Sequence, residues 1–344
     1  MDKSFWSIIQ WLPNEVLSEV LRFCAPRELA ILLRVAKLFN GIGLPLLYRD
    51  VYLGISQGKR ASVLSFMASI ERDPARARMI KGIRIIALDL ENIEAVTPIM
   101  EGIRNFTTIV PAIVQLTNIE VFRIVCEFDE EALLDLLDVA FFTKIHTLTL
   151  AFSGLLHPSQ ISPFINRHPT LRSVSLQSNS VFGDNFSVFL SAFPRIELLE
   201  HMSAPFEYFL GDIPSKNLTS ASIDFSVYGR PEIGRTFVSL ANSAAKDSCK
   251  TLVCTTQGSY TPLMEYISGL MPKIENLTIR SGPLPRFASF DELAKLKHLK
   301  KFTHITVDKD DDGLQKAIDR VDDQLFHGMS STLSLLKLCT HGKF

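Results

Sequence analysis

The chain has 344 residues, of which 47% are hydrophobic and 21% are charged, and this length and apolar content allow more than one compact domain. Its 36 basic and 37 acidic side chains leave a formal net charge of -1. No basic excess is therefore present to neutralise a phosphate backbone, which argues against nucleic-acid binding, and no run approaches the roughly 18 apolar residues that a membrane helix needs.

The first residues and the cysteines bear on the cellular compartment. Residues 1–16 contain only a short apolar stretch, interrupted by Gln10, and lack the small-residue cleavage site of a signal peptide. The five cysteines are odd in number and form no C-x-x-C pair. Such scattered thiols are typical of a reducing compartment, where they pack as small hydrophobic residues. We therefore expect a cytoplasmic or nuclear protein.

Three short helices are predicted within the first fifty residues. Pro13 suits the first turn of a helix, and the apolar residues after it share one helical face: Val16, Leu17, Val20 and Leu21. A second helix is expected from Arg27 to about Arg34. A third should begin at Val35, and Gly41 and Gly43 are expected to end it. These helices carry more apolar surface than they can bury among themselves, which indicates a protein partner.

The stretch from Leu12 to Val51 resembles an F-box, and its ending is similar to that of fungal F-box proteins. The residues that carry the resemblance are Leu12–Pro13, Glu15–Leu17, Val20–Leu21, Arg27–Leu29, Val35, Lys37 and Phe39. The sequence departs from the family pattern at Ala36, where a Cys is common, and at Phe39, where a Trp is common.

The resemblance implies that this module binds the small SKP-type adaptor subunit of a cullin–RING ubiquitin ligase. The residues implied to bind that subunit are Leu12, Pro13, Val16, Leu17, Val20, Leu21, Leu29, Val35 and Phe39. The alternative is that such residues only form the core of a helical bundle, and it stays open for Val35 and Phe39. Leu12 and Pro13 lie outside the first helix and have little core to join, so contact with the adaptor subunit is favoured for them.

Residues 52–79 are predicted to connect this module (residues 1–51) to a repeat domain (residues 80–344). The connection contains an expected helix from Arg60 to Glu71, which would cap the repeat domain. Within the repeat domain, three apolar positions separated by two residues and then by one recur about ten times. The triplets are Ile83-Ile86-Leu88, Ile119-Phe122-Ile124, Ile145-Leu148-Leu150, Leu171-Val174-Leu176, Ile196-Leu199-His201, Leu218-Ala221-Ile223, Cys249-Leu252-Cys254, Ile274-Leu277-Ile279, Leu299-Phe302-His304 and Leu333-Leu336-Leu338.

Helix-like segments separate many of these strand-like triplets, at residues 130–142, 185–193, 232–246 and 262–271. A proline often stands two residues before a triplet and ends the helix, as at Pro169, Pro194 and Pro272. This alternation resembles leucine-rich repeats, although their characteristic Asn occurs once, at Asn179. We therefore predict an α/β fold: a short all-α F-box of three helices, followed by a leucine-rich-repeat solenoid of roughly ten divergent repeats with a parallel concave sheet.

Side chains that alternate with the apolar positions should point to the concave face, where repeat proteins hold their partners. One row is expected to contain Arg123, Thr149, Ser175, Glu200, Ser222 and Thr278, and the next Asp89, Gln177, Asp224 and Arg280. Fixed charges supply specificity, so the favoured substrate contacts are Arg123, Glu200, Asp224 and Arg280. The alternative is that these side chains only keep an exposed sheet soluble.

Catalytic and metal-binding motifs give little support to other functions. No G-x-S-x-G, phosphate loop, H-E-x-x-H or paired Cys/His spacing occurs, so no catalytic residue, cofactor or metal is predicted. Cys249 and Cys254 fall on triplet positions and are expected in the core. Residues 308–319 match a calcium loop in part, but the twelfth residue is Asp319 rather than Glu. A solvated loop in which Asp312 caps a helix is the favoured interpretation.

The sequence thus predicts a non-catalytic substrate adaptor of an SCF (cullin–RING) ubiquitin ligase. Its F-box would bind the SKP-type adaptor subunit, and its concave face would bind a protein substrate that the sequence does not identify. The alternative is a repeat scaffold or receptor that works without a ligase. An enzyme is the third class, and no constellation of residues supports it.

Overall fold

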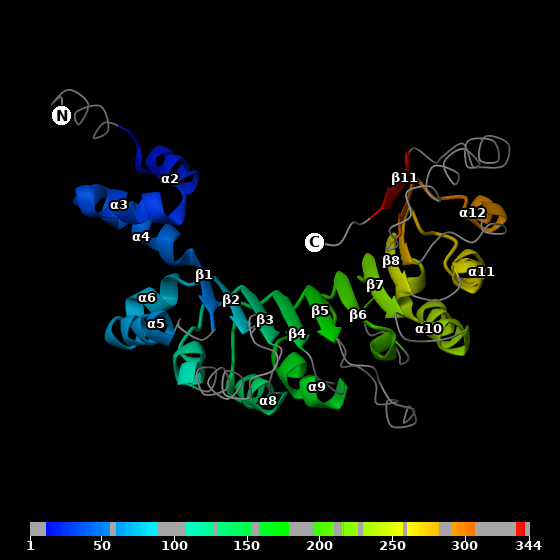
Figure 1. The fold of residues 1–344 in the computed structure, drawn as a ribbon, viewed down its shortest axis with the longest axis horizontal. Coiled ribbons are helices and arrows are strands. Elements are labelled where there is room, and N and C mark those ends of the chain that lie inside the picture. Colours follow the sequence, from blue (N-terminus) through cyan, green and yellow to red (C-terminus); the bar gives the residue numbers. More distant parts are fainter. Residues whose placement is uncertain are drawn as a thin grey trace. The chain divides into compact units, whose positions relative to one another are not determined.

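The structure is a computed structural model that describes residues 12–55, 60–87, 108–126, 130–152, 158–178, 196–209, 215, 217–225, 230–256, 260–281, 290–306 and 335–340. Contacts between residues divide the chain into two compact units. Unit 1 comprises Met1–Phe128 and Val139–Ile145, and unit 2 comprises Asp129–Asp138 and His146–Phe344. Both units contain helices and parallel strands, which confirms the predicted α/β class (Figure 1).

The described part of unit 1 begins with three helices around a small apolar core. They are α2 (Asn14–Arg22), α3 (Pro26–Val35) and α4 (Lys37–Arg49). The core cluster consists of Leu17, Leu21, Leu29, Leu33 and Phe39. The sequence sets the start of α3, because Pro26 fits the first helical turn and the Glu28 carboxylate accepts a hydrogen bond of 2.9 Å from the Ala25 N–H.

Helix α4 is longer than the sequence predicts. The expectation that Gly41 and Gly43 would end it is wrong, because the helix continues to Arg49. Gly43 is buried, and a Cβ at this position would lie 2.7 Å from Leu33 Cδ2 and 3.0 Å from Leu29 Cδ1. The glycine therefore lets α4 approach α3 closely, and the contact outweighs the low helix propensity of glycine.

Three parallel strands of unit 1 pair in chain order: β1 (Asp50–Gly54), β2 (Gly82–Ala87) and β3 (Val121–Cys126). Between β1 and β2 lie α5 (Arg60–Arg72) and α6 (Pro74–Met79), so the helix expected at residues 60–71 is confirmed. Residues 108–114 are also helical. The sequence prediction contains no strand before residue 80, because β1 coincides with the end of the F-box-like stretch.

The first apolar triplet is shifted from its predicted place. Ile83 and Ile85 are buried on β2 and lie in register with the buried pair of β3. Ile80 is fully buried before them, whereas Ile86 is only partly buried on the opposite face. The triplet is therefore Ile80-Ile83-Ile85 rather than Ile83-Ile86-Leu88, because a run of isoleucines satisfies the spacing at both places.

Unit 2 contains parallel strands that pair in chain order, which confirms the predicted parallel sheet. They are β4 (Thr147–Phe152), β5 (Ser173–Ser178), β6 (His201–Pro205), β7 (Ser220–Phe225), β8 (Thr251–Thr256), β9 (Asn276–Ser281), β10 (Lys301–Thr306) and β11 (Leu335–Thr340). Helices cover one face of this sheet (Figure 1). They are α8 (Glu130–Val139), α9 (Pro158–Arg167), α10 (Arg230–Asn242), α11 (Tyr260–Leu270) and α12 (Phe290–Lys295), with short 3-10 helices η2 (Phe206–Phe209) and η3 (Ala244–Lys246).

Several strands of unit 2 bury every second side chain on the helix-covered face. In β4, β7 and β8 partly buried and buried residues alternate without exception. Cys249 and Cys254 are buried at triplet positions, as predicted. Burial raises the pKa of the Cys249 thiol to about 11, so this thiol is protonated at neutral pH and packs as a small hydrophobic residue.

The triplet at β6 is also shifted by three residues. Met202 and Ala204 are buried on this strand and lie in register with buried residues of its neighbours. His201, which the sequence assigns to the triplet that begins at Ile196, is exposed. The triplet is therefore Leu199-Met202-Ala204. Its third position holds a small alanine, so the sequence pattern did not identify it.

Candidate protein-binding surfaces

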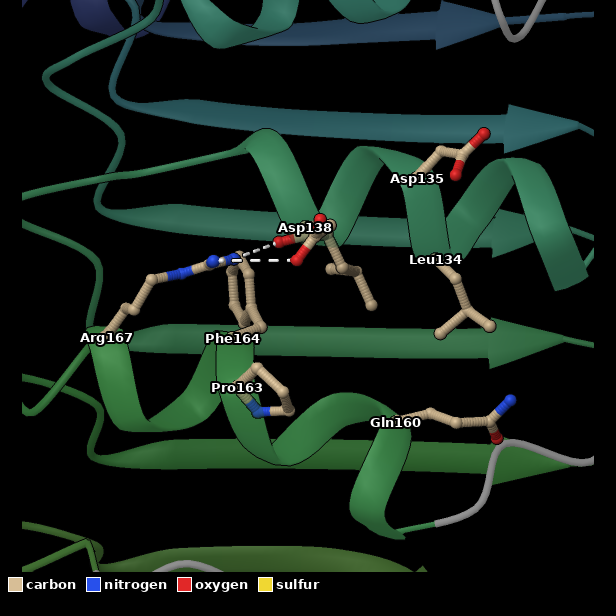
Figure 2. Close-up of a pocket in the computed structure, with 8 residues that line it drawn as sticks. Leu134, Asp135, Asp138, Gln160, Pro163, Phe164 and Arg167 are labelled. Carbon is tan, nitrogen blue, oxygen red and sulfur yellow. Dashed lines mark hydrogen bonds and ion pairs between the residues drawn. The ribbon is translucent and has the colours of Figure 1, made fainter.

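A shallow pocket lies between α8 and α9 on the helical side of unit 2 (Figure 2). Its volume of about 280 Å³ is below the usual size of a ligand site. Arg167 occupies one end: its Nη2 donates a 2.6 Å hydrogen bond to the Leu137 carbonyl, and its Nη1 lies 3.7 Å from Asp138 Oδ1. The arginine therefore satisfies a carbonyl in the last turn of α8. This contact explains the position of Arg167 at the pocket by a structural role.

Two buried histidines of unit 2 are likewise held by local contacts. His304 Nε2 lies 2.9 Å from Ser281 Oγ, and burial lowers the pKa of His304 to about 4. His168 Nδ1 lies 2.6 Å from the Phe164 carbonyl oxygen, and burial lowers the pKa of His168 as well. Both imidazoles are therefore neutral at neutral pH and are enclosed within the unit, where no substrate can reach them.

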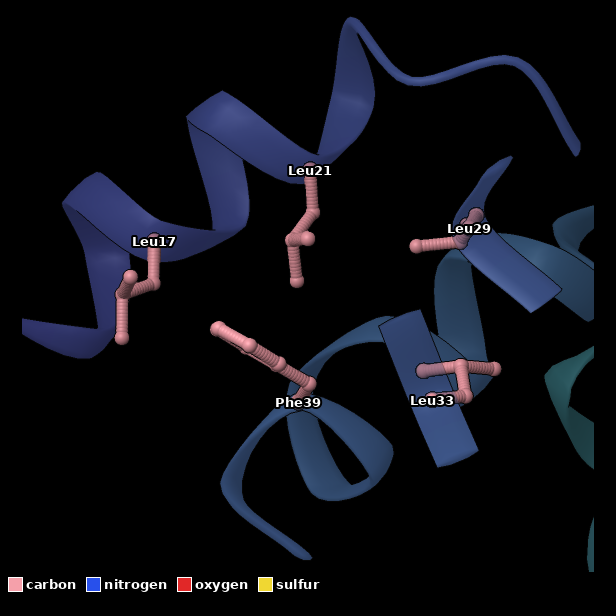
Figure 3. Close-up of a cluster of buried hydrophobic side chains, with 5 residues drawn as sticks. All are labelled: Leu17, Leu21, Leu29, Leu33 and Phe39. Atoms are coloured by element: carbon pink, nitrogen blue, oxygen red, sulfur yellow. The ribbon is translucent and has the colours of Figure 1, made fainter. Parts of the chain in front are cut away.

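Helix α2 carries apolar side chains on two sides, and Figure 3 shows Leu17 and Leu21 on the side that faces the core. Leu17 faces the core and is 4% exposed, whereas Val16, Val20 and Phe23 are 44%, 54% and 88% exposed. The spacing of these three residues places them on one side of the helix, and the exposed Leu12 precedes them. We call Leu12, Val16, Val20 and Phe23 the α2 stripe. A row of exposed apolar side chains of this kind is typical of a surface that a partner covers.

A second exposed apolar group lies on α3 and at the start of α4. Ile31 and Val35 are one helical turn apart, on the side of α3 opposite to its buried leucines, and Leu38 follows on α4. The F-box resemblance does not include Phe23 or Ile31. Their spacing from Val16 and Val35 on the same helical faces would have identified them.

The nine residues predicted to bind the SKP-type subunit divide into two groups. The exposed group is Leu12, Pro13, Val16, Val20 and Val35, and the buried group is Leu17, Leu21, Leu29 and Phe39. A second protein has no access to the buried group in this bundle, so these side chains support the exposed ones. The sequence left open whether Val35 and Phe39 bind the adaptor subunit or form the core. In the structure Phe39 belongs to the core and Val35 lies on the surface.

The opposite face of the unit 2 sheet, which we call the unit 2 open face, is lined by small polar side chains. Strand register gives its middle row as Thr149, Ser175, Ser203, Ser222, Val253, Thr278 and Thr303. The rows on either side add the charged residues Asp224, Arg280 and Lys301. This face therefore offers many hydroxyl groups and few fixed charges to a partner.

The four predicted substrate contacts are divided between the two units, with Arg123 in unit 1 and the others in unit 2. Asp224 on β7 and Arg280 on β9 share one row of the unit 2 open face, with Thr255 between them. Arg123 lies on β3 of unit 1, where it is in register with Arg84. A role of these three residues in substrate binding stays a prediction.

Glu200 lies just before β6, and the row predicted for it is wrong, because Ser203 stands opposite Ser175 in the register. The Glu200 N–H donates a 2.8 Å hydrogen bond to the Arg172 carbonyl. Its carboxylate lies 3.1 Å from Arg172 Nη1. The shifted triplet at β6 caused the error, since it moved every assigned position of this strand by three residues.

Glu200 stands directly before a strand, and charged residues occupy the same position before several other strands of unit 2. Before β8, β9 and β10 this position holds Lys250, Glu275 and Lys300. Glu275 lies 2.6 Å from Lys300 Nζ and 3.4 Å from Lys250 Nζ, and the hydrogen bond from Lys300 is the main cause that lowers the pKa of Glu275. Glu200 thus belongs to a row of ion pairs between neighbouring strand starts.

Arg76 on α6 joins the three-helix bundle to the rest of unit 1. Its Nη1 donates hydrogen bonds of 2.8 Å to Ser69 Oγ and 3.4 Å to Tyr48 Oη. The guanidinium lies 5.6 Å from the centre of the Tyr48 ring and pairs with Asp73 at 3.0 Å. One side chain therefore links α4, α5 and α6.

In the part of the chain that the structure describes, no helix has the length and apolar character to cross a membrane, and no three His, Cys, Asp or Glu side chains gather as a metal site. The calcium-loop match at residues 308–319 lies outside the described residues, as do the helix expected at residues 185–193, Asp89 and Asn179. No family model matches the chain, and comparison with curated proteins gives no match.

Proposed function

We propose that this protein is a non-catalytic substrate adaptor of a cullin–RING ubiquitin ligase. Its three-helix bundle acts as an F-box that binds an SKP-type adaptor subunit, and its strand–helix repeats act as a leucine-rich-repeat solenoid that holds a protein substrate. The observation that carries the proposal is the α2 stripe, which leaves apolar side chains in water on the same helix that has the F-box resemblance.

The α2 stripe is suited to bind another protein. Fully burying a Val or Phe side chain contributes roughly 1.5–3 kcal/mol, so the stripe offers a substantial gain to a partner that covers it. Leu17 and Leu21 fix the opposite side of α2 in the core. The stripe is therefore ordered before binding, which lowers the entropy that a partner must remove.

The repeats support the substrate-holding part of the proposal. Strands β4, β7, β8 and β9 of unit 2 bury one side and leave the other partly or fully exposed, so a broad polar surface is built from several short elements. The contacts of Arg76 support a firm connection between the bundle and the first strands of unit 1. A ligase adaptor needs both features, because it must hold a substrate at a defined place.

Affinity purification with quantitative mass spectrometry tests the proposal. The wild-type protein, a Val16→Asp/Val20→Asp variant and a Val238→Asp control are expressed as full chains. Val238 on α10 is 46% exposed, which matches the two α2 valines. We expect wild type and control to capture the SKP-type subunit and a cullin, and the α2 variant to lose both while it retains other partners.

Two outcomes would contradict this function. Equal recovery of cullin with the α2 variant would show that the stripe does not bind the SKP-type subunit. Stable capture of other proteins by the wild type, without any cullin, would favour a scaffold or receptor that works outside a ligase.

A further inference from the structure

The turns that lead into β8, β9 and β10 place lysines along one edge of unit 2. The buried first residues of these three triplets, Cys249, Ile274 and Leu299, are 25 residues apart, so equivalent turn positions stack in neighbouring repeats. Strand register agrees with this alignment, because Lys301 on β10 pairs with Asn276 on β9. All the cationic side chains of these turns are exposed except Lys250, which is partly buried. We call them the lysine edge: Lys246, Lys250, Lys273, Lys295, Lys297, His298, Lys300 and Lys301.

Positive charge exceeds negative charge along the lysine edge. Residues 244–251, 271–276 and 295–301 contain seven lysines but only two carboxylates, Asp247 and Glu275. Glu292 on α12 adds a third carboxylate by pairing with Lys295. Four positive charges therefore remain in excess, although the whole chain has 36 basic and 37 acidic side chains. Such a local concentration of one sign of charge attracts a partner of the opposite sign over a screening length of about 8–10 Å.

Glu275 shows how these lysines hold a carboxylate. Its carboxylate lies 2.6 Å from Lys300 Nζ and 3.4 Å from Lys250 Nζ, so it connects the repeats on either side of it. Lys273 holds Asp247 at 2.6 Å in the same way, across one repeat. A carboxylate of another protein would find further ammonium groups, each with three donors, in these turns.

The composition of the three turns favours an acidic protein segment over other polyanions. Residues 244–251, 271–276 and 295–301 contain no arginine and no aromatic residue. Arginine is the side chain best suited to paired contacts with phosphates, and aromatic side chains stack the bases of single-stranded nucleic acids. The leucines of the last turn, Leu296 and Leu299, are buried and cannot insert into a lipid surface. Lysines alone suit flexible carboxylate side chains.

We propose that the lysine edge binds a segment of a partner protein that is rich in Asp and Glu. This inference goes beyond the proposed function, which assigns no partner to the strand starts. Neighbouring strands lie about 4.8 Å apart, so the starts of β8, β9 and β10 span about 10 Å. An extended segment of six residues spans roughly 20 Å and can therefore reach all three turns with several carboxylates.

Fluorescence anisotropy with the full chain tests the proposal in about 50 mM sodium chloride, where charge is weakly screened. The probe is a fluorescein-labelled peptide, Gly-Asp-Glu-Asp-Glu-Asp-Glu-Gly. We expect the wild type to bind it and Lys246→Gln/Lys301→Gln to bind about tenfold more weakly. Lys144→Gln/Arg235→Gln removes two exposed cations outside the lysine edge and should bind like the wild type. The peptide with Asn and Gln in place of Asp and Glu should not bind.

Two further measurements locate the bound peptide and exclude unfolding. A carbodiimide, which couples carboxylates to amines, should crosslink the acidic peptide to lysines of the lysine edge and not to Lys144, as mass spectrometry of the digested protein would show. Lys246→Gln/Lys301→Gln should unfold at no lower temperature than the wild type, because the change removes like charges from an exposed edge.

The proposal is overturned if the wild type does not bind the acidic peptide at concentrations up to about 1 mM, or if the two double variants bind it equally well. Equally tight binding of a single-stranded DNA of the same charge would assign the edge to nucleic acid, and equally tight binding to vesicles of anionic lipid would assign it to a membrane. Tighter peptide binding by Asp308→Asn/Asp310→Asn/Asp311→Asn would show that the chain's own acidic segment occupies the edge.

Binding of an SKP-type subunit is measured in parallel on the same proteins. Lys246→Gln/Lys301→Gln should retain it, because neither residue belongs to the α2 stripe. Failure of the lysine edge and failure of the ligase function are therefore distinguishable.

Discussion

The three-helix bundle and the unit 2 sheet place their apolar residues differently. Helix α2 has apolar side chains on two sides, of which only one is buried, so Phe23 is 88% exposed while Leu17 is 4% exposed. In the unit 2 sheet, apolar residues are concentrated on the helix-covered face, and hydroxyl groups line the other. The fold therefore explains the apolar pattern of the sheet, whereas it leaves the exposed apolar side chains of α2 unexplained, and these support the proposed binding of a partner.

This difference separates two kinds of functional surface. An apolar surplus on a short helix predicts a partner that binds by burial, and its location is visible in the exposed fractions of the side chains. A polar open face gives no such indication, because hydroxyl groups are equally suited to water.

The largest expected effect contrasts a buried residue of the sheet with an exposed residue of the bundle. Leu277→Ala on β9 should lower the free energy of unfolding by about 2–5 kcal/mol, because it leaves a cavity at a fully buried position. Val20→Ala on α2 should change it by at most about 0.5 kcal/mol. Urea denaturation measures both, and equal losses would contradict the assignment of Val20 to a free surface.

The next effect concerns the pH dependence of the stability, to which the buried His304 on β10 contributes. Burial lowers the folded-state pKa of His304 from 6.5 to about 4, so between these values the unfolded chain binds the proton and the folded chain does not. Stability from this group is therefore full above pH 6.5 and is lost as the pH falls toward 4, by up to about 3 kcal/mol. The His304→Leu variant should lack this part of the pH dependence, as urea denaturation across the range would show. Parallel pH profiles for the two proteins would refute the prediction.

Two glycines of α4 test the close helix contact in the bundle. Gly43→Ala should destabilise the protein by about 1–3 kcal/mol, because the added methyl group meets Leu33 and Leu29. Gly41→Ala is the matched control: nothing lies within 4 Å of its added Cβ, and the higher helix propensity of Ala should stabilise by about 0.5–1 kcal/mol. Changes of the same sign in thermal unfolding would contradict the contact.

The smallest effect is expected on the unit 2 open face. Ser222→Ala removes a hydroxyl from the middle of the row without touching the buried side of β7, so stability should change by at most about 0.5 kcal/mol. Calorimetry measures this difference. A loss of several kcal/mol would mean that the open face is part of a core and is not available to a substrate.

Much of this fold was predictable, because buried residues at strand and helix spacing dominate the sequence. Helix α5 and the helices of residues 130–142, 232–246 and 262–271 lie where the pattern predicts them, with boundaries that differ by a few residues. The two shifted triplets show why the apolar spacing alone does not fix the register of a strand. A spacing of three and two is satisfied at neighbouring places when extra apolar residues such as Ile86 occur, and only the pairing with adjacent strands selects one of them.

The candidate sites depended more strongly on tertiary structure. The sequence could not separate the buried Phe39 from the exposed Val35, because both lie on apolar helical faces. It also could not place Arg84 beside Arg123, since β2 and β3 are far apart in the chain and their register is set by pairing. Helix α4 continued through Gly43 because of a contact with α3 that no local propensity describes.

Isothermal titration of a purified SKP-type adaptor subunit into the full chain tests the central claim most directly. The wild type and the Val238→Asp control should bind with the same affinity. Val16→Asp/Val20→Asp should bind at least about a hundredfold more weakly while its thermal unfolding stays unchanged, because charges replace apolar contacts at the centre of the α2 stripe. Equal affinities for all three proteins would contradict the assignment of this bundle as the ligase-binding module.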